Sequence, residues 1–337
     1  MDSAAILTPE RLLRQLEWRV VRRLDGQLQG DYRSLFRGSG LDFTNLREYE
    51  PGDDLRHIEW NVTARMDTPY VREYVEDREV TAWLLLDHSA SMGFGPIDRQ
   101  KDLVLAEIAT TLALVLARRG NRVGAVLFDA DVEKVIPPRS GRNQVLRIAD
   151  ILLDRRNPAS IRDSRRQRSA LAVSGGRAPT DPASAAARRP RRRRGEAEPG
   201  RQVTDLSVLL RAAGGLMRRR SLVIVVSDFF SVPGWEGPLG RLARRHDVVA
   251  LQVSDRRESE LPDVGSIYVE DTETGEQIFV DTSDPAFRLR LRAASEERQV
   301  QLEEATRSAG VELHEIRTDD DLVRSLLRVA ALRRSRR

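Results

Sequence analysis

The residues most able to bind a metal ion follow an apolar segment of strand length. Residues 80–86 are largely apolar, and Asp87, Ser89 and Ser91 come directly after them with the spacing Asp-x-Ser-x-Ser. A strand that is apolar on both faces is typical of a parallel sheet covered by helices. Since open α/β sheets bind ligands at the carboxyl ends of their strands, this spacing places one carboxylate and two hydroxyls where a ligand would bind.

A second group of oxygen donors has the same relation to a later strand. Residues 221–226 form another apolar run, and Asp228 follows it after one residue. Thr204 precedes a helix predicted over residues 205–217, so a loop offers a third hydroxyl. If the two strands are neighbours in the sheet, the two aspartates face each other across one edge.

These five side chains suit a hard divalent cation. Mg²⁺ and Mn²⁺ prefer oxygen ligands, and Mg²⁺ takes a near-octahedral shell that usually retains several water molecules. Because three of the ligands are uncharged, the ion keeps excess positive charge, and an acidic side chain of another protein is the natural group to complete its shell. The predicted metal site comprises Asp87, Ser89, Ser91, Thr204 and Asp228.

The elements that must position these residues alternate in type. Strands are expected at residues 80–86, 122–128, 132–136, 221–227, 247–253 and 311–317. Helices are expected at residues 98–118, 143–153, 205–217, 239–245, 284–309 and 319–332. This alternation predicts βαβ units and a doubly wound, mostly parallel α/β sheet, interrupted by a β-hairpin at residues 266–281.

The N-terminal part of the chain has a different pattern. An amphipathic helix is predicted over residues 10–24, and Gly and Pro separate short apolar stretches in residues 36–74. We expect a small N-terminal subdomain at residues 1–78 and the α/β domain at residues 79–333. Within the subdomain, ion pairs are expected among Asp53, Asp54, Arg56 and Arg65.

Residues 155–201 form an Arg-rich insert. They contain fourteen Arg against four acidic residues, so the rest of the chain has a net charge of −6 although the whole chain carries +4. Large apolar residues are almost absent, and burial could not offset the entropy lost on ordering. We predict that the insert is disordered and interrupts a single domain, because strands and helices of the same kind continue on both sides.

The composition excludes several kinds of protein and site. The chain has no Cys, which rules out disulfides, zinc-thiolate sites and cysteine nucleophiles. No apolar run reaches the length of a membrane span, and the first residues do not have the pattern of a signal peptide. The sequence therefore predicts a cytoplasmic protein.

Two resemblances extend this interpretation. The spacing Asp-x-Ser-x-Ser with a later Thr and a later Asp resembles the metal-ion-dependent adhesion site of von Willebrand factor A domains, which implies a von Willebrand factor A-like, Rossmann-type fold. Upstream, residues 42–60 read DFTNLREYEPGDDLRHIEW, followed by AR at 64–65 and VREY at 71–74. These segments resemble the bacterial domain-of-unknown-function family fifty-eight.

The resemblance implies a partner and a set of ligands. Members of that family are typically encoded beside MoxR-type AAA+ ATPases, so such an ATPase, or its client, is the expected partner. Asp87, Ser89 and Ser91 match the first metal motif, and Asp228 matches the last. The family usually has glycines before the threonine, whereas residues 201–203 are Arg-Gln-Val in front of Thr204.

Other interpretations of the same residues stay open. Asp and Ser are also the usual residues of helix N-caps and turns. A Mg²⁺-dependent phosphate-handling enzyme would use Asp87 and Asp228, although no Walker A or Gly-x-Ser-x-Gly motif is present. Nucleic acid could bind the Arg tracts at residues 188–194 and 333–337, but the insert has no aromatic residues for base stacking. We expect a non-enzymatic, metal-dependent protein-interaction module that acts as an adaptor or co-chaperone-like partner of a MoxR-type AAA+ ATPase.

Overall fold

The structure is a computed structural model that describes most of the chain outside the Arg-rich insert. The described residues are 8–17, 41–51, 53–66, 68–76, 80–95, 99–154, 204–270 and 277–335. The predicted disorder of residues 155–201 falls outside these ranges. So does the second half of the helix predicted over residues 10–24.

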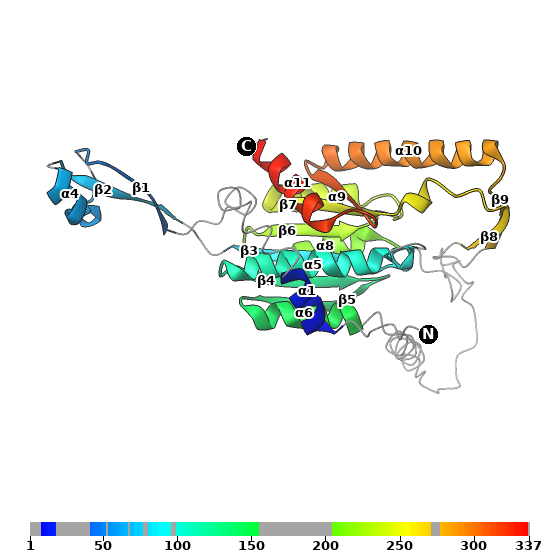
Figure 1. The fold of residues 1–337 in the computed structure, drawn as a ribbon, viewed down its shortest axis with the longest axis horizontal. Helices are drawn as coiled ribbons and strands as arrows, with labels where there is room; N and C mark the ends of the chain where they lie inside the picture. Colours follow the sequence, from blue (N-terminus) through cyan, green and yellow to red (C-terminus); the bar gives the residue numbers. More distant parts are fainter. Residues whose placement is uncertain are drawn as a thin grey trace, which may run out of the picture.

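A six-stranded sheet forms the centre of the α/β domain (Figure 1). Its strands are β3 (Thr81–Asp87), β4 (Arg122–Phe128), β5 (Val132–Arg139), β6 (Leu222–Ser227), β7 (Asp247–Ser254) and β10 (Glu312–Arg317). The spatial order is β10-β7-β6-β3-β4-β5, and only β5 is antiparallel to its neighbour. The prediction of a mostly parallel α/β sheet is confirmed.

The strand order shows where the chain reverses the direction in which it adds strands to the sheet, which is called the direction change below. Counted along the chain, the six strands lie in the spatial order 3-2-1-4-5-6, which is the order of a doubly wound sheet. The change of direction falls between the first and the fourth strands, which are β3 and β6. Ligands of such sheets bind in the crevice outside the carboxyl ends of these two strands.

The apolar sequence of β3 results from burial on both of its faces. Successive side chains of a strand point to opposite faces, so Leu84 and Leu86 pack into one core while Trp83 and Leu85 pack into the other. Helices cover each face. The first core includes residues of α1 (Pro9–Leu16), α5 (Lys101–Arg118), α6 (Arg142–Asp154) and α11 (Leu322–Ser335). The second includes residues of α8 (Leu206–Leu216), α9 (Glu236–Arg245) and α10 (Pro285–Ser308).

Helix α1 differs from the prediction in its packing. We assigned it to the N-terminal subdomain, but its apolar face belongs to the first core of the α/β domain. Leu12, Leu13 and Leu16 are buried there, in a helix that contacts α5 and α6. The helix is amphipathic because this face needs a partner, and the α/β domain supplies it.

Residues 42–74, called the signature segment below, form a small unit of their own. Strands β1 (Leu41–Glu48) and β2 (Tyr70–Glu76) pair antiparallel, with the 3-10 helix η2 (Leu55–His57) and α4 (Trp60–Met66) between them. Figure 1 shows this unit to one side of the six-stranded sheet. Among its charged residues, Arg47 pairs with Asp53 through two hydrogen bonds of 2.5 and 2.8 Å. Asp54, expected in an ion pair, instead accepts a hydrogen bond from the backbone N–H of Arg56 and caps η2.

The predicted hairpin is present. Strands β8 (Ser266–Glu270) and β9 (Gln277–Asp281) pair antiparallel and precede α10. The rings of Tyr268 and Phe279 lie 5.2 Å apart on this hairpin, and both side chains are exposed. Among the described helices, none is both long and apolar enough to cross a membrane.

Candidate functional site

The first metal motif lies at the carboxyl end of β3. Asp87 is the last residue of the strand, and the 3-10 helix η3 (Ala90–Gly93) begins three residues later. The backbone N–H of Ser89 donates to Asp87 Oδ1 at 2.9 Å, and this turn brings the Ser89 and Ser91 hydroxyl oxygens to 3.1 Å from each other. All three side chains are buried. The spacing of two residues therefore does place two hydroxyls beside the carboxylate.

The second carboxylate follows β6, the neighbour of β3. A hydrogen bond of 2.6 Å from Ser227 Oγ to Asp87 Oδ2 joins the ends of the two strands. Asp228, the next residue, is buried, and its Oδ1 accepts a hydrogen bond from the backbone N–H of Phe230. The chain turns sharply between Asp228 and Phe230, because Phe229 has a left-handed backbone with φ 57°. The structure thus brings both predicted aspartates to the direction change of the sheet.

Thr204 reaches the same region through its backbone. It lies on the loop before α8, and its carbonyl accepts a hydrogen bond from the backbone N–H of Val232 at 3.0 Å. Ser231 Oγ accepts one from the backbone N–H of Leu206. These two contacts hold the loop before α8 against the loop after β6. The Thr204 side chain is buried at that position.

The site is rich in negative charge. Burial, followed by the negative charge of Asp228, raises the pKa of Asp87 from its ordinary value to about 7. The hydrogen bonds from Ser227 and Ser89 act in the opposite direction but do not compensate for burial. A cation beside the two carboxylates would favour their charged forms.

Two residues that the sequence analysis passed over join this cluster. The Lys101 ammonium lies 2.6 Å from Asp228 Oδ2 and 2.5 Å from Glu258 Oε1. Burial lowers the pKa of Lys101, but the charges of the two carboxylates outweigh it and hold the pKa above its ordinary value. One signal was available in the sequence, because Lys101 is one of only two lysines in a chain that otherwise uses Arg.

Glu258 comes from the end of a third strand. It is the last residue of the 3-10 helix η4 (Arg256–Glu258), which follows β7. Its Oε2 accepts a hydrogen bond from the backbone N–H of Asp255, and the Asp255 side chain caps the same helix. Burial raises the pKa of Glu258, while Lys101 lowers it. The ends of β3, β6 and β7 therefore all contribute to one charged cluster.

Arg298 of α10 also contacts this cluster, at Asp228 and Phe230. Its guanidinium group lies 3.1 Å from the centroid of the Phe230 ring, and its Nη2 donates to the backbone carbonyl of Asp228 at 3.1 Å. Burial lowers the pKa of Arg298, and the charges of Asp228 and Glu258 act against this effect. Arg298 thus fixes the backbone at Asp228 rather than its carboxylate.

The predicted metal ligands are three hydroxyls and two carboxylates. Over the described residues, no three His, Cys, Asp or Glu side chains come together as a group that could hold a metal ion. The predicted set contains only two carboxylates, so such a group was not expected. Any ion bound here would depend on the serine and threonine hydroxyls as well.

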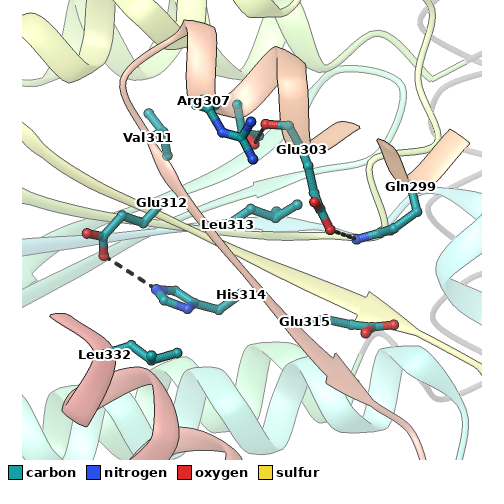
Figure 2. A pocket seen from close by; sticks show the side chains of 10 residues that line it. Gln299, Glu303, Arg307, Val311, Glu312, Leu313, His314, Glu315 and Leu332 are labelled. Atoms are coloured by element: carbon teal, nitrogen blue, oxygen red, sulfur yellow. Dashed lines mark hydrogen bonds and ion pairs between the residues drawn. The ribbon is translucent and has the colours of Figure 1, made fainter. Parts of the chain in front are cut away.

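A separate cavity of about 340 Å³ lies along the edge strand β10 (Figure 2). Side chains of α10, β10 and α11 line it, and Figure 2 shows Glu312 pointing toward His314 and Gln299 bonded to Glu303. Strands β7 and β6 lie between β10 and β3. The cavity is therefore distinct from the candidate metal site.

Comparison with known proteins places the chain in a family. Residues 45–301 match the family described as "Protein of unknown function DUF58". The chain belongs to the DUF58 family. The matched range contains the whole cluster around Asp87 and Asp228, together with most of the signature segment that suggested this family.

Relatives of this DUF58 chain include two mycobacterial proteins. The uncharacterized proteins Rv1480 of Mycobacterium tuberculosis and Mb1516 of Mycobacterium bovis are each 33% identical to it, over 96% of this chain and 89% of theirs.

Two solved structures are more distant. They are BatB from Bacteroides thetaiotaomicron, with a TM-score of 0.41, and an aerotolerance-related membrane protein from Bacteroides fragilis, with a TM-score of 0.40. Each is 14% identical to the DUF58 chain and covers 77% of it and 100% of its own length.

Proposed function

We propose that this DUF58 protein is a divalent-metal-dependent protein-interaction module with a von Willebrand factor A-like metal-ion-dependent adhesion site. Asp87, Ser89, Ser91, Thr204 and Asp228 would bind Mg²⁺ or Mn²⁺. The observation that carries the proposal is the pair of serine hydroxyls, 3.1 Å apart, beside buried aspartates at the ends of adjacent strands.

The environment of the donors fits a hard cation. Buried carboxylates cost free energy unless positive charge compensates them; the Lys101 ammonium pairs with Asp228, and a divalent ion would also compensate Asp87. Hydroxyl and carboxylate oxygens are the ligands that Mg²⁺ and Mn²⁺ prefer. The direction change between β3 and β6 is also the usual position of a ligand in a doubly wound sheet.

The chemistry of the site favours binding over catalysis. A bound ion would offer an open coordination position to an acidic side chain of a partner. Asp87 is a poor candidate for a nucleophile, because it has no exposed surface and both of its carboxylate oxygens accept hydrogen bonds. The resemblance of the signature segment suggests that the partner is a MoxR-type AAA+ ATPase or its client.

Within the part of the chain that the structure describes, no observation favours nucleic-acid binding. Arg333, the first residue of the C-terminal Arg tract, is buried and donates to Asp247 Oδ1 at 2.7 Å. It is engaged within the fold and therefore not available to a phosphate. The Arg tract of the insert lies outside the described residues.

Thermal unfolding in the presence of metal tests the proposal. A ligand that binds only the folded protein stabilises it by RT ln(1 + [L]/Kd), which is about 2.7 kcal/mol at a hundredfold excess over Kd. We expect Mg²⁺ or Mn²⁺ to raise Tm relative to EDTA. The double variant Ser89→Ala/Ser91→Ala keeps both carboxylates but should lose most of this increase.

The control is Ser283→Ala, which removes an exposed hydroxyl far along the chain. It should leave the metal-dependent increase in Tm unchanged. Identical unfolding curves of the parent protein in Mg²⁺, Mn²⁺ and EDTA would rule out a metal site of useful affinity.

A further inference from the structure

Lys101 brings a positive charge into the candidate metal site. Its side chain is 1% exposed, as is that of Asp228, to which its ammonium is bonded. Its second partner, Glu258, is 18% exposed. Burying an ammonium group is costly unless it is paired and hydrogen-bonded, and the two carboxylates meet that need.

The position of Lys101 in its helix has no local explanation. It is the first residue of α5, where the helix macrodipole disfavours a cation. Its ammonium instead lies 5.8 Å from the ring centroid of Phe94 and 5.4 Å from that of Phe230. Aromatic faces attract cations, so these rings also favour the ammonium at this place. Lys101 is therefore held by the cluster and not by the helix.

We infer that the Lys101 ammonium is a built-in counter-cation of the metal site, which competes with the divalent ion for the charge of Asp228 and so weakens metal binding. This inference rests on the proposed metal site. The ammonium is bonded to Asp228 Oδ2, on the carboxylate that we assign to the ion. Two cations that share one carboxylate also repel each other, because the buried site screens their charges weakly.

Glu258 has the opposite effect on the ion. Glu258 gives the ammonium a second ion-pair partner. Lys101 can therefore keep an ion pair with Glu258 while the Asp228 carboxylate binds the metal ion. The Glu258 carboxylate, 2.5 Å from the Lys101 ammonium, also adds a negative charge near the site. Removing the charge of Lys101 should therefore tighten metal binding, and removing the charge of Glu258 should weaken it.

Titration of Mn²⁺ into the full-length protein tests the inference. Calorimetry gives the affinity, and the electron paramagnetic resonance signal of free Mn²⁺ gives the bound fraction. Relative to the parent, we expect Lys101→Met to bind Mn²⁺ at least about tenfold more tightly, equivalent to about 1.4 kcal/mol. We expect Glu258→Gln to bind it several-fold more weakly.

The second lysine provides a matched control. Lys134 lies on the edge strand β5 and is exposed. Lys134→Met removes the same charge from the chain, and it should leave the Mn²⁺ affinity unchanged. A similar gain in affinity in Lys134→Met and Lys101→Met would mean that only net charge matters, and it would overturn the inference.

The outcomes separate this inference from the proposed function. Binding by the parent that is unchanged or weaker in Lys101→Met overturns the role of Lys101 and leaves the metal site standing. Binding that appears only in Lys101→Met supports the competition. Absence of binding in both proteins overturns the metal site and this inference together.

A further variant guards against loss of folding. Lys101→Met leaves the buried carboxylate of Asp228 and the partly exposed carboxylate of Glu258 without their cation, and this can prevent folding. In that case the double variant Lys101→Met/Glu258→Gln, which removes one charge of each sign, is compared with Glu258→Gln. Tighter Mn²⁺ binding in the double variant supports the inference, and equal or weaker binding overturns it.

Discussion

At the scale of single residues, Asp87 combines two opposing demands. Its carboxylate is buried beside Asp228, which favours the protonated form, but two hydrogen bonds to its oxygens favour the charged form. Burial dominates, and the pKa rises to about 7. A divalent ion would reverse this balance by favouring the charged form.

This balance predicts a pH dependence for the metal-free protein. Because the pKa of Asp87 is about 7 when folded and has its ordinary value when unfolded, the folded state holds a proton that the unfolded state has lost. The contribution of Asp87 to stability is complete below about pH 4 and is lost as the pH rises toward about 7. The loss is at most about 1.4 kcal/mol per pH unit.

Urea unfolding in EDTA at several pH values measures this effect. Asp87→Asn, which is neutral at every pH in this window, should show a flatter dependence of the free energy of unfolding than the parent. The same decline in both proteins would show that Asp87 keeps an ordinary pKa. Saturating Mg²⁺ should reduce the decline in the parent only.

At the scale of elements, β3 contributes both to packing and to the candidate metal site. Its residues alternate between two cores, and its carboxyl end carries the metal motif. Burial on both faces fixes the strand in the centre of the sheet. The position of Asp87 therefore depends on packing on either side of β3.

Truncation of β3 should destabilise the protein from both faces. Leu84 packs into the first core and Leu85 into the second, and neither is exposed. We expect Leu84→Ala and Leu85→Ala each to lower the free energy of unfolding by about 2–5 kcal/mol, measured by chemical denaturation. Val300→Ala on α10, where the side chain is 54% exposed, should change it by less than about 0.5 kcal/mol.

A large cost from only one of the two leucines would contradict a strand buried on both faces. The sheet would then have one face open to solvent, as antiparallel sheets often do. Because Leu84 and Leu85 are adjacent in the chain, local helix or strand propensity could not account for such a difference.

At the scale of the whole molecule, charge is distributed unevenly. The Arg-rich insert carries an excess of ten positive charges, and the rest of the chain is acidic. In the sequence the insert lies between α6 and Thr204, and the sheet includes strands from both sides of it. The small unit of β1, β2 and α4 exposes Leu55, Trp60 and Met66, a group of apolar side chains outside either core.

Binding of the proposed partner protein should depend on the metal ion. If a bound ion captures an acidic side chain, binding of the MoxR-type AAA+ ATPase that we propose as the partner should require metal. We expect pull-down from purified components in Mg²⁺, and strongly reduced recovery with EDTA or with Ser89→Ala/Ser91→Ala. Equal recovery under all of these conditions would mean that the ATPase docks elsewhere, for example on the exposed residues of α4.

The class of the fold and the Asp-x-Ser-x-Ser part of the candidate site could be predicted from the sequence alone. Apolar runs of strand length, the helical periods between them and the Asp-x-Ser-x-Ser spacing are local features, and each was found where it was expected. Each of these features can be recognised from residues that are close in the sequence. The apolar runs, for example, arise because burial on both faces of a strand requires apolar side chains at every position. The hairpin at residues 266–281 was also predictable, but from two short strand-like segments close together in the sequence and not from burial.

Which distant residues meet depends on how the strands and helices pack together. Ser227 and Asp87 are 140 residues apart, and Lys101 is 127 residues from Asp228 and 157 from Glu258. These contacts follow from the order of the strands, since β3, β6 and β7 are brought side by side by packing and not by any local preference. Helix α1 likewise has an amphipathic sequence that predicts a buried face but does not specify the helices that cover it.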